Sequence, residues 1–154
     1  MTVRIEYDDR DVQDALNRLQ ARVDDLDPVM REIAGHLKDS VDEAFASQAT
    51  PDGSAWKPLA ESTIVDRLRR GYRAGPILER SGDLAGRLLA VWDAESAVVG
   101  SGQTFGGNVL AAAVHHFGTR DGRVPARPFF AVSDEARSAI IDSLLDHLGE
   151  PLER

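Results

Sequence analysis

The adjacent histidines His115 and His116 are the most obvious candidates in this sequence for metal binding or proton transfer. Imidazole is a common metal ligand and proton carrier. In a helix, however, neighbouring side chains point about 100° apart, so the pair does not share one ligand face. The helical zinc pattern needs two histidines four residues apart, with a glutamate between them. The sequence lacks that pattern, so we predict no metal site. We expect one histidine of the pair to face the core and hydrogen-bond to backbone.

Other patterns that carry catalysis or bind cofactors are also incomplete. Ser101 lies between two glycines, but without the strand-to-helix elbow of a nucleophilic serine. Gly106-Gly107 lacks the spacing of a phosphate-binding loop, and Lys57 lies far from it. Acidic pairs such as Asp8-Asp9 and Asp24-Asp25 fall at helix ends, where solvation explains them. The sequence therefore predicts no catalytic residues and no cofactor, and indicates a binding or structural protein rather than an enzyme.

A proline-rich stretch ending in two phenylalanines is the best candidate for a docking element. Pro125 and Pro128 fix their own backbone and hold Val124 and Arg127 in extended conformations. A rigidly held arginine followed by Phe129 would offer a planar donor beside a large apolar anchor. The alternative is a loop that plugs the edge of its own core with phenylalanine side chains. The residues alone leave both interpretations open.

Two other features suit the same interface hypothesis. Trp56 follows a tight turn, and either covers the core locally or anchors a partner. The stretch from Arg67 to Arg73 is the most basic of the chain, and either contacts an acidic partner or phosphate or is a solvated loop. The candidate partner-interface residues are Trp56, Arg67, Arg70, Arg123, Arg127 and Phe129.

Composition narrows the class of protein further. The chain has 154 residues and no cysteine, which excludes disulfides and thiolate zinc sites. No stretch approaches the roughly 20 apolar residues that span a bilayer, and the N-terminus lacks the apolar run of a signal peptide. We therefore expect no membrane partner.

Charge is unevenly distributed along the chain. Residues 1–49 carry 12 acids and 6 bases, residues 50–131 carry 8 acids and 10 bases, and residues 132–154 carry 6 acids and 2 bases. The net charge of −8 argues against free nucleic acid as the main ligand, because such binding depends on neutralising phosphates. Acidic ends beside a mildly basic middle could favour contacts between copies, or could be solvated helix faces.

Periodicity predicts the elements that would position these residues. Alternation over Val3–Tyr7 indicates a short strand. Apolar stripes over Val12–Leu26 and Met30–Phe45, separated by Asp27-Pro28, predict two amphipathic helices. Further on, the pattern predicts a β-hairpin from Leu88–Trp92 and Ala97–Val99, a buried helix over Val109–Phe117 ending at Gly118, a final strand over Phe129–Val132 and a helix that Ser133 caps.

Together these elements predict an α+β fold in which a small antiparallel sheet packs with an N-terminal helical hairpin and a C-terminal helix. The length suits a single domain over residues 1–154. Within it we expect a strand and helical hairpin at 1–47, a loop-rich β core with short helices at 48–132, and the C-terminal helix at 133–149.

A series of short motifs runs in a fixed order along the middle of the chain. They are Phe45, Pro51-Asp52-Gly53, Trp56, Pro58-Leu59, Thr63, Arg67, Leu78, Ser81-Gly82 with Leu84, Val98-Val99-Gly100, His115-His116-Phe117-Gly118 and Pro125-Ala126-Arg127-Pro128-Phe129. In this order they resemble the phage virion morphogenesis family, which includes the Mu-type tail-completion proteins. The chain departs from the family at Ser81, where Thr is frequent, and at His116, where Gln is frequent. It also has alanine where the family often has a tyrosine shortly before the histidine pair.

The resemblance implies a structural protein of a tailed bacteriophage or prophage, without catalysis, that completes the tail or neck at the head–tail junction. Its partners would be copies of itself in a hexameric ring, together with other neck, head-completion, tail-tube or tail-terminator proteins. DNA would be met only as the passing genome. The protein would be found in the virion, and in the host cytoplasm during assembly. The alternative is a cellular protein-binding module with no role in a virion.

Overall fold

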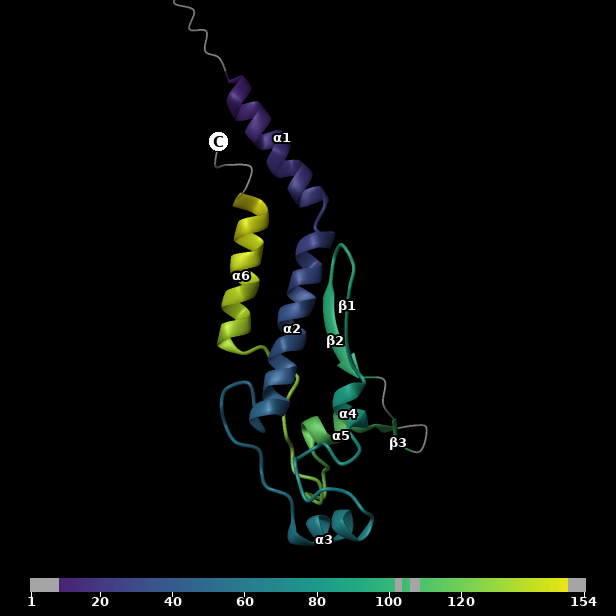
Figure 1. The fold of residues 1–154 in the computed structure, drawn as a ribbon. Coiled ribbons are helices and arrows are strands. Elements are labelled where there is room, and N and C mark those ends of the chain that lie inside the picture. The colour runs from purple at the N-terminus through teal and green to yellow at the C-terminus, as the bar shows by residue number, and fades with distance from the viewer. Residues whose placement is uncertain (1–8, 102–103, 106–108, 150–154) are drawn as a thin grey trace, which may run out of the picture.

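The computed structural model describes residues 9–101, 104–105 and 109–149, and Figure 1 shows an elongated molecule. In chain order the elements are α1 (Arg10–Asp24), α2 (Asp27–Ser47), α3 (Glu61–Arg69), α4 (Asp83–Gly86), β1 (Leu88–Trp92), β2 (Ala97–Ser101), β3 (Thr104–Phe105), β4 (Val109–Leu110), α5 (Ala111–Phe117) and α6 (Asp134–Gly149). The predicted α+β class is confirmed, with two helices at the N-terminal end and one at the C-terminal end. The strand predicted over Val3–Tyr7 lies outside the described residues.

The long helix α2 organises the fold. Pro28 lies in its first turn, where a missing backbone N–H costs nothing. Along its length α2 packs against α6, β1 and β2. In Figure 1, α1 stands nearly end to end with α2. Helix α6 lies beside α2 and also reaches α1. None of the side chains of α1 is buried, so α1 extends beyond the core.

The predicted hairpin forms the main sheet. Strands β1 and β2 are antiparallel, with Leu88 opposite Ser101 and Trp92 opposite Ala97. The side chain of Asp93 closes the turn by accepting hydrogen bonds from the backbone N–H of Glu95 (2.9 Å) and of Ser96 (2.7 Å). The shorter strands β3 and β4 form a second antiparallel pair.

Three aromatic side chains from distant parts of the sequence form the centre of the core. Phe45, Trp56 and Phe129 meet edge to face, with ring centroids 5.1 to 6.4 Å apart. Phe129 is completely buried, and Trp56 donates a hydrogen bond from Nε1 to the carbonyl of Pro128 at 3.1 Å. This arrangement joins the end of α2, the loop after it and the proline-rich stretch.

Two predicted elements near the C-terminal half differ in the structure. Val109 and Leu110 pair with β3 instead of starting the helix, so α5 begins at Ala111. The strand predicted over Phe129–Val132 is wrong, and no strand forms there. The backbone N–H groups of Phe129 and Phe130 both donate to Nδ1 of His116, at 3.2 Å each, rather than to a neighbouring strand. The side chain of His116, which is distant in sequence, accepts the hydrogen bonds that a neighbouring strand would otherwise accept from Phe129 and Phe130.

Candidate functional site

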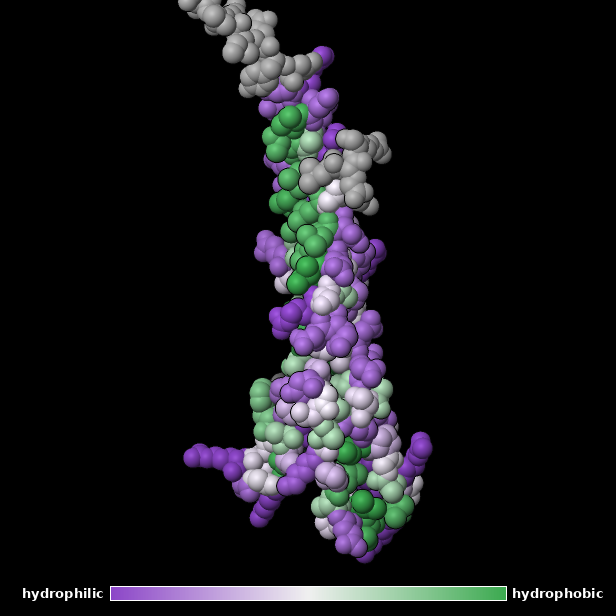
Figure 2. Space-filling model, turned by 90° about the vertical axis from the view of Figure 1, so that its left-hand side faces the viewer, coloured by the Kyte–Doolittle hydropathy of each residue, from purple (hydrophilic) through white to green (hydrophobic). Residues whose placement is uncertain are grey.

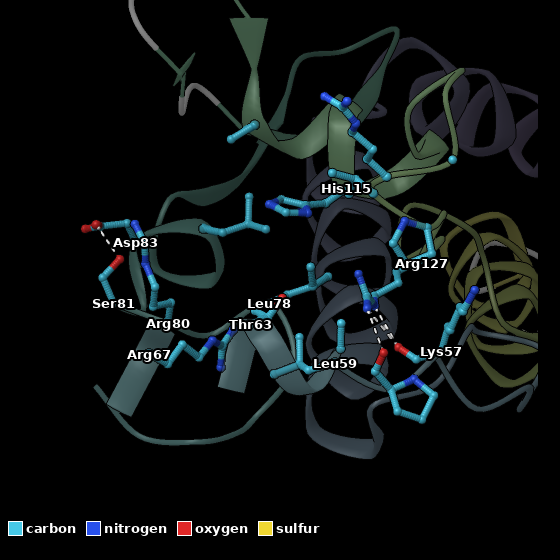
Figure 3. A pocket seen from close by; sticks show the side chains of 18 residues that line it. Lys57, Leu59, Thr63, Arg67, Leu78, Arg80, Ser81, Asp83, His115 and Arg127 are labelled. Carbon is cyan, nitrogen blue, oxygen red and sulfur yellow. Dashed lines mark hydrogen bonds between the residues drawn. The ribbon is translucent and has the colours of Figure 1, made fainter. Parts of the chain in front are cut away.

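A pocket of about 800 Å³ lies between α3, α4, α5 and the loops around Lys57 and Arg123 (Figure 3). Part of its wall is aliphatic and comes from Leu59, Leu78, Leu84, Val124 and Pro125. The ionisable side chains that line it are Lys57, Arg67, Arg80, Asp83, His115, Arg123 and Arg127. The pocket therefore combines apolar walls with a strong excess of basic groups.

Arg127 is held in the pocket by backbone carbonyls. Its Nε and Nη2 donate to the carbonyl of Lys57 at 3.0 and 2.9 Å, and Nη2 also donates to that of Pro58 at 3.3 Å. Its own backbone N–H donates to the carbonyl of His115 at 2.9 Å. The residue is only 5% exposed. The flanking prolines hold this segment extended, so Arg127 links the loop after α2 to the end of α5.

Arg67 is the second buried arginine of the pocket. It extends from α3, and its Nη1 donates to the carbonyl of Pro76 at 2.7 Å. Its Nε is buried and has no hydrogen-bond partner among the described residues. An unsatisfied buried donor costs about 1–3 kcal/mol. Arg67 is therefore less well satisfied than Arg127.

The electrostatic environment of these side chains is one-sided. Burial lowers the pKa of Arg67, and the positive charge of Arg80 lowers it further. Burial and then the charge of Arg67 lower the pKa of Arg127. Burial, followed by the charges of Arg127 and Arg67, lowers the pKa of His115. Every charge that shifts these pKa values is positive, so the pocket favours anions over cations.

The loop carrying Arg123 is tied to itself rather than to the core. The backbone N–H of Thr119 donates to the carbonyl of Val124 at 2.9 Å, and the backbone N–H of Val124 donates to Oγ1 of Thr119 at 2.9 Å. Arg123 extends from this loop with its side chain 87% exposed and contacts Asp121 at 3.3 Å. It stands at the rim of the pocket, where it is free to change partner.

The structure divides the six candidate interface residues into two groups. Trp56, Arg67, Arg127 and Phe129 are buried, while Arg70 and Arg123 are exposed. Trp56 and Phe129 thus have the alternative role that the sequence left open, filling the core of their own chain. The pocket brings together Arg67, Arg123 and Arg127. Arg70 lies outside it and pairs with Asp66 at 2.9 Å. Whether these residues contact a partner stays a prediction.

The candidate residues predicted from the sequence did not include three basic residues of the pocket lining, Lys57, Arg80 and His115. No spacing signal distinguishes Arg80 from the other arginines of the loop region, because only the fold brings it near Arg67. The expectation that one histidine of the pair hydrogen-bonds to backbone is confirmed by His116. Its neighbour His115 instead lines the pocket.

The family profile described as "Phage virion morphogenesis family" matches residues 7–149 of the chain. The chain belongs to this family. The match includes both the core aromatics and the arginine-lined pocket, so the resemblance carried by the motifs of the middle region extends to nearly the whole protein. A role in phage assembly follows from this membership.

Individual relatives of this virion morphogenesis protein come from phage and prophage genomes. "Putative capsid assembly protein G" of Escherichia phage Mu is 30% identical over 149 residues, covering 88% of this chain and 92% of the relative. "Mu-like prophage FluMu G protein 1" of Haemophilus influenzae is 28% identical over 152 residues, covering 97% of each chain. "Mu-like prophage FluMu G protein 2" from the same organism is 27% identical over 143 residues, covering 90% of this chain and 89% of the relative. No solved structure matches the chain.

Metal-holding clusters of side chains and membrane-spanning helices are both absent from the residues that the structure describes. Among residues 9–101, 104–105 and 109–149, no cluster of three or more histidine, aspartate or glutamate side chains is placed to hold a metal ion. In the same ranges, every helix is too short or too polar to cross a bilayer.

Proposed function

We propose that this protein is a non-enzymatic structural component of a tailed bacteriophage or prophage virion, and that it completes the tail or neck at the head–tail junction. The observation that carries the proposal is the family match over residues 7–149. Relatives from phage Mu and Mu-like prophages that are similar over most of their length support the assembly role. The junction itself comes from the resemblance to Mu-type tail-completion proteins.

The surface of the molecule supports a role in an assembly. Figure 2 shows apolar side chains gathered in a long strip over the helical half of the molecule. Exposed apolar residues on α1 and α6 include Val12, Leu16, Val23, Ile141 and Leu145, each at least half exposed. A continuous apolar strip of this kind marks an interaction site in most soluble proteins. A protein that works inside a particle would have it covered by neighbouring subunits.

We further propose that the partners are copies of this chain in a hexameric ring and the neck, head-completion or tail-tube proteins beside it. The exposed arginines Arg70 and Arg123 are suited to the rim of such contacts, where charge pairs set register more than affinity. DNA would pass as the genome without being a specific ligand, consistent with the net charge of −8. The protein would assemble in the host cytoplasm and stay in the virion.

The direct test is a nonsense mutation of the gene in its phage or prophage, followed by electron microscopy of the induced lysate. We expect filled heads beside unattached tails, restored to whole particles by the wild-type gene supplied in trans. Intact, infectious particles from the mutant would overturn the proposal and favour a cellular binding module. Empty or malformed heads would overturn the junction assignment and place the protein in head assembly instead.

A further inference from the structure

The arginine-lined pocket holds positive charge that no ion pair among the described residues neutralises. Among the described residues neither Arg67 nor Arg127 forms an ion pair, although each is 95% buried. Asp83 is an acid of the lining, and Figure 3 shows it beside Ser81, across the pocket from Arg127. Its Oδ2 accepts a hydrogen bond from Oγ of Ser81 at 2.7 Å. Buried charges without partners are costly, which makes a bound anion favourable.

Hydrogen-bonding capacity also remains in the pocket. A guanidinium has five N–H donors, and the bonds of Arg67 to other described residues use only Nη1. In its side-chain hydrogen bonds to other described residues, Arg127 uses Nε and Nη2 and leaves Nη1 available. Arg80 is exposed at the opening, with its guanidinium carbon 5.3 Å from the ring centroid of Tyr72. Planar donors of this kind match the two oxygens of a carboxylate.

The walls and the overall charge favour a carboxylate on a protein over a phosphate of DNA. Leu59, Leu78 and Leu84 give the recess an aliphatic surface that would pack against the stem of a glutamate or aspartate and its apolar neighbours. A backbone phosphate has no such stem and lies on a wide, highly charged surface. The chain as a whole carries −8, which disfavours close approach of a polyanion.

We propose that the pocket binds a side-chain carboxylate from an acidic segment of a protein partner, with Arg80 and Arg127 as donors and Arg67 as the buried charge behind them. This inference rests on the proposed function, because it gives the chemistry of one contact made during assembly. Its occupant comes either from a second copy of this chain or from another virion protein.

The test is a titration of the purified full chain that is monitored by nitrogen–proton correlation NMR. Sodium chloride keeps the ionic strength constant throughout. Glutarate serves as the carboxylate probe and inorganic phosphate as the competing anion. We expect glutarate to give saturable shifts in the backbone amides of residues 78–84 and of Arg123, Val124, Ala126 and Arg127. Removing one donor in Arg80→Gln should weaken the glutarate Kd at least about fivefold, as expected for loss of one charged contact.

A matched control keeps this experiment specific. Arg87→Gln removes another exposed arginine that does not line the pocket, so its Kd should equal that of the wild type. Because Arg80 is exposed, its replacement leaves the fold intact, which the unchanged spectrum away from the pocket verifies. Absence of saturable shifts, equal weakening by Arg80→Gln and Arg87→Gln, or tighter binding of phosphate than of glutarate would each overturn the proposal.

Light scattering distinguishes the two sources of the carboxylate. If a second copy supplies it, glutarate and Arg80→Gln both lower the mass of the purified chain in solution. If another virion protein supplies it, the mass stays the same under both changes. These measurements are independent of the lysate microscopy. The nonsense mutant could give free heads and tails while the purified chain fails to bind glutarate. That combination would overturn the carboxylate-binding proposal and leave the proposed function standing.

Discussion

Gly118 shows how a single residue holds the pocket loop in place. It follows the last residue of α5 with φ of +74°. A Cβ at this position would lie 2.7 Å from the backbone nitrogen of Ala126 and 2.8 Å from the carbonyl oxygen of Val124. Both contacts are with backbone, so the loop would have to move to accommodate a side chain.

We predict that Gly118→Ala lowers the free energy of unfolding by about 3 kcal/mol, through the left-handed backbone and the backbone clash together. Gly122→Ala is the matched control, since Gly122 has φ of +71° but open space around its Cβ position. That control should cost only about 1 kcal/mol, from the backbone conformation alone. Urea denaturation measures both, and equal losses for the two variants would show that the close contact is not important.

His116 makes the stability of the protein dependent on pH. Its Nδ1 accepts two backbone hydrogen bonds, so the ring must be neutral at that atom. Burial lowers its pKa below the ordinary value of 6.5, and the pKa of His115 is lowered as well. The unfolded chain therefore binds more protons than the folded chain below pH 6.5. The stabilisation is fully present above that pH and is lost as the pH falls through and below it.

We predict that the free energy of unfolding of the wild type falls as the pH is lowered from 6.5, the ordinary pKa of histidine, toward the lower pKa of the folded state. In His116→Gln the fall should be smaller, because the amide oxygen can accept the same N–H groups and does not titrate. Urea denaturation across that pH range gives both slopes. Identical slopes would contradict a role for His116 in the pH dependence.

At the scale of elements, α1 and α2 differ although both have regular apolar stripes. Leu16 on α1 is 54% exposed, whereas Phe45 on α2 is 5% exposed. An isolated helix of fifteen residues is marginal in water, so α1 depends on its contact with α6. His147 supports this contact, with its Nε2 lying 2.9 Å from the carbonyl oxygen of Arg22.

For the free protein we predict that Leu16→Ala lowers the free energy of unfolding by less than about 1 kcal/mol, since little apolar area is lost from the interior. Phe45→Ala should cost about 3–5 kcal/mol because it empties the aromatic centre of the core. Denaturation at low protein concentration compares the two variants. A cost for Leu16→Ala close to that for Phe45→Ala would mean that α1 is buried in the free protein.

At the scale of the whole molecule, the burial of Arg127 and Phe129 changes how an interface can be tested. Substituting them would damage the fold before it tested any contact. The exposed arginines Arg70 and Arg123 offer a cleaner experiment, because among the described residues each makes a single ion pair, and that pair is exposed. Such surface pairs contribute about 0–1 kcal/mol to stability.

We predict that Arg70→Glu combined with Arg123→Glu lowers the yield of infectious particles at least about tenfold when it complements the nonsense mutant, because reversed charges at a rim misplace the partner. Arg87→Glu combined with Arg137→Glu, which reverses two other exposed arginines, serves as the control for net charge. Plaque titres measure the effect, and circular dichroism verifies that the variant folds. A normal titre from the double variant would remove both residues from the proposed interface.

The sequence by itself determined the α+β class, the β-hairpin, the helices near both ends of the chain and the family of this protein. These features depend on local information: apolar periodicity in α2, the turn residues after Trp92 and the order of short motifs. Gly118 was likewise predictable as the end of a helix. The signals are local because hydrogen bonding and side-chain direction within one element repeat over a few residues.

Only the tertiary structure decided which side chains are buried and which meet. Arg67, Arg80 and Arg127 come from separate segments, and no spacing in the sequence indicates that they share a pocket. The segment Phe129–Val132 has the composition of a strand, yet His116 takes the backbone donors of its first two residues. Whether a polar or charged group is buried, and what it bonds to, depends on partners far away in the chain. Packing alone brings those partners within hydrogen-bonding distance.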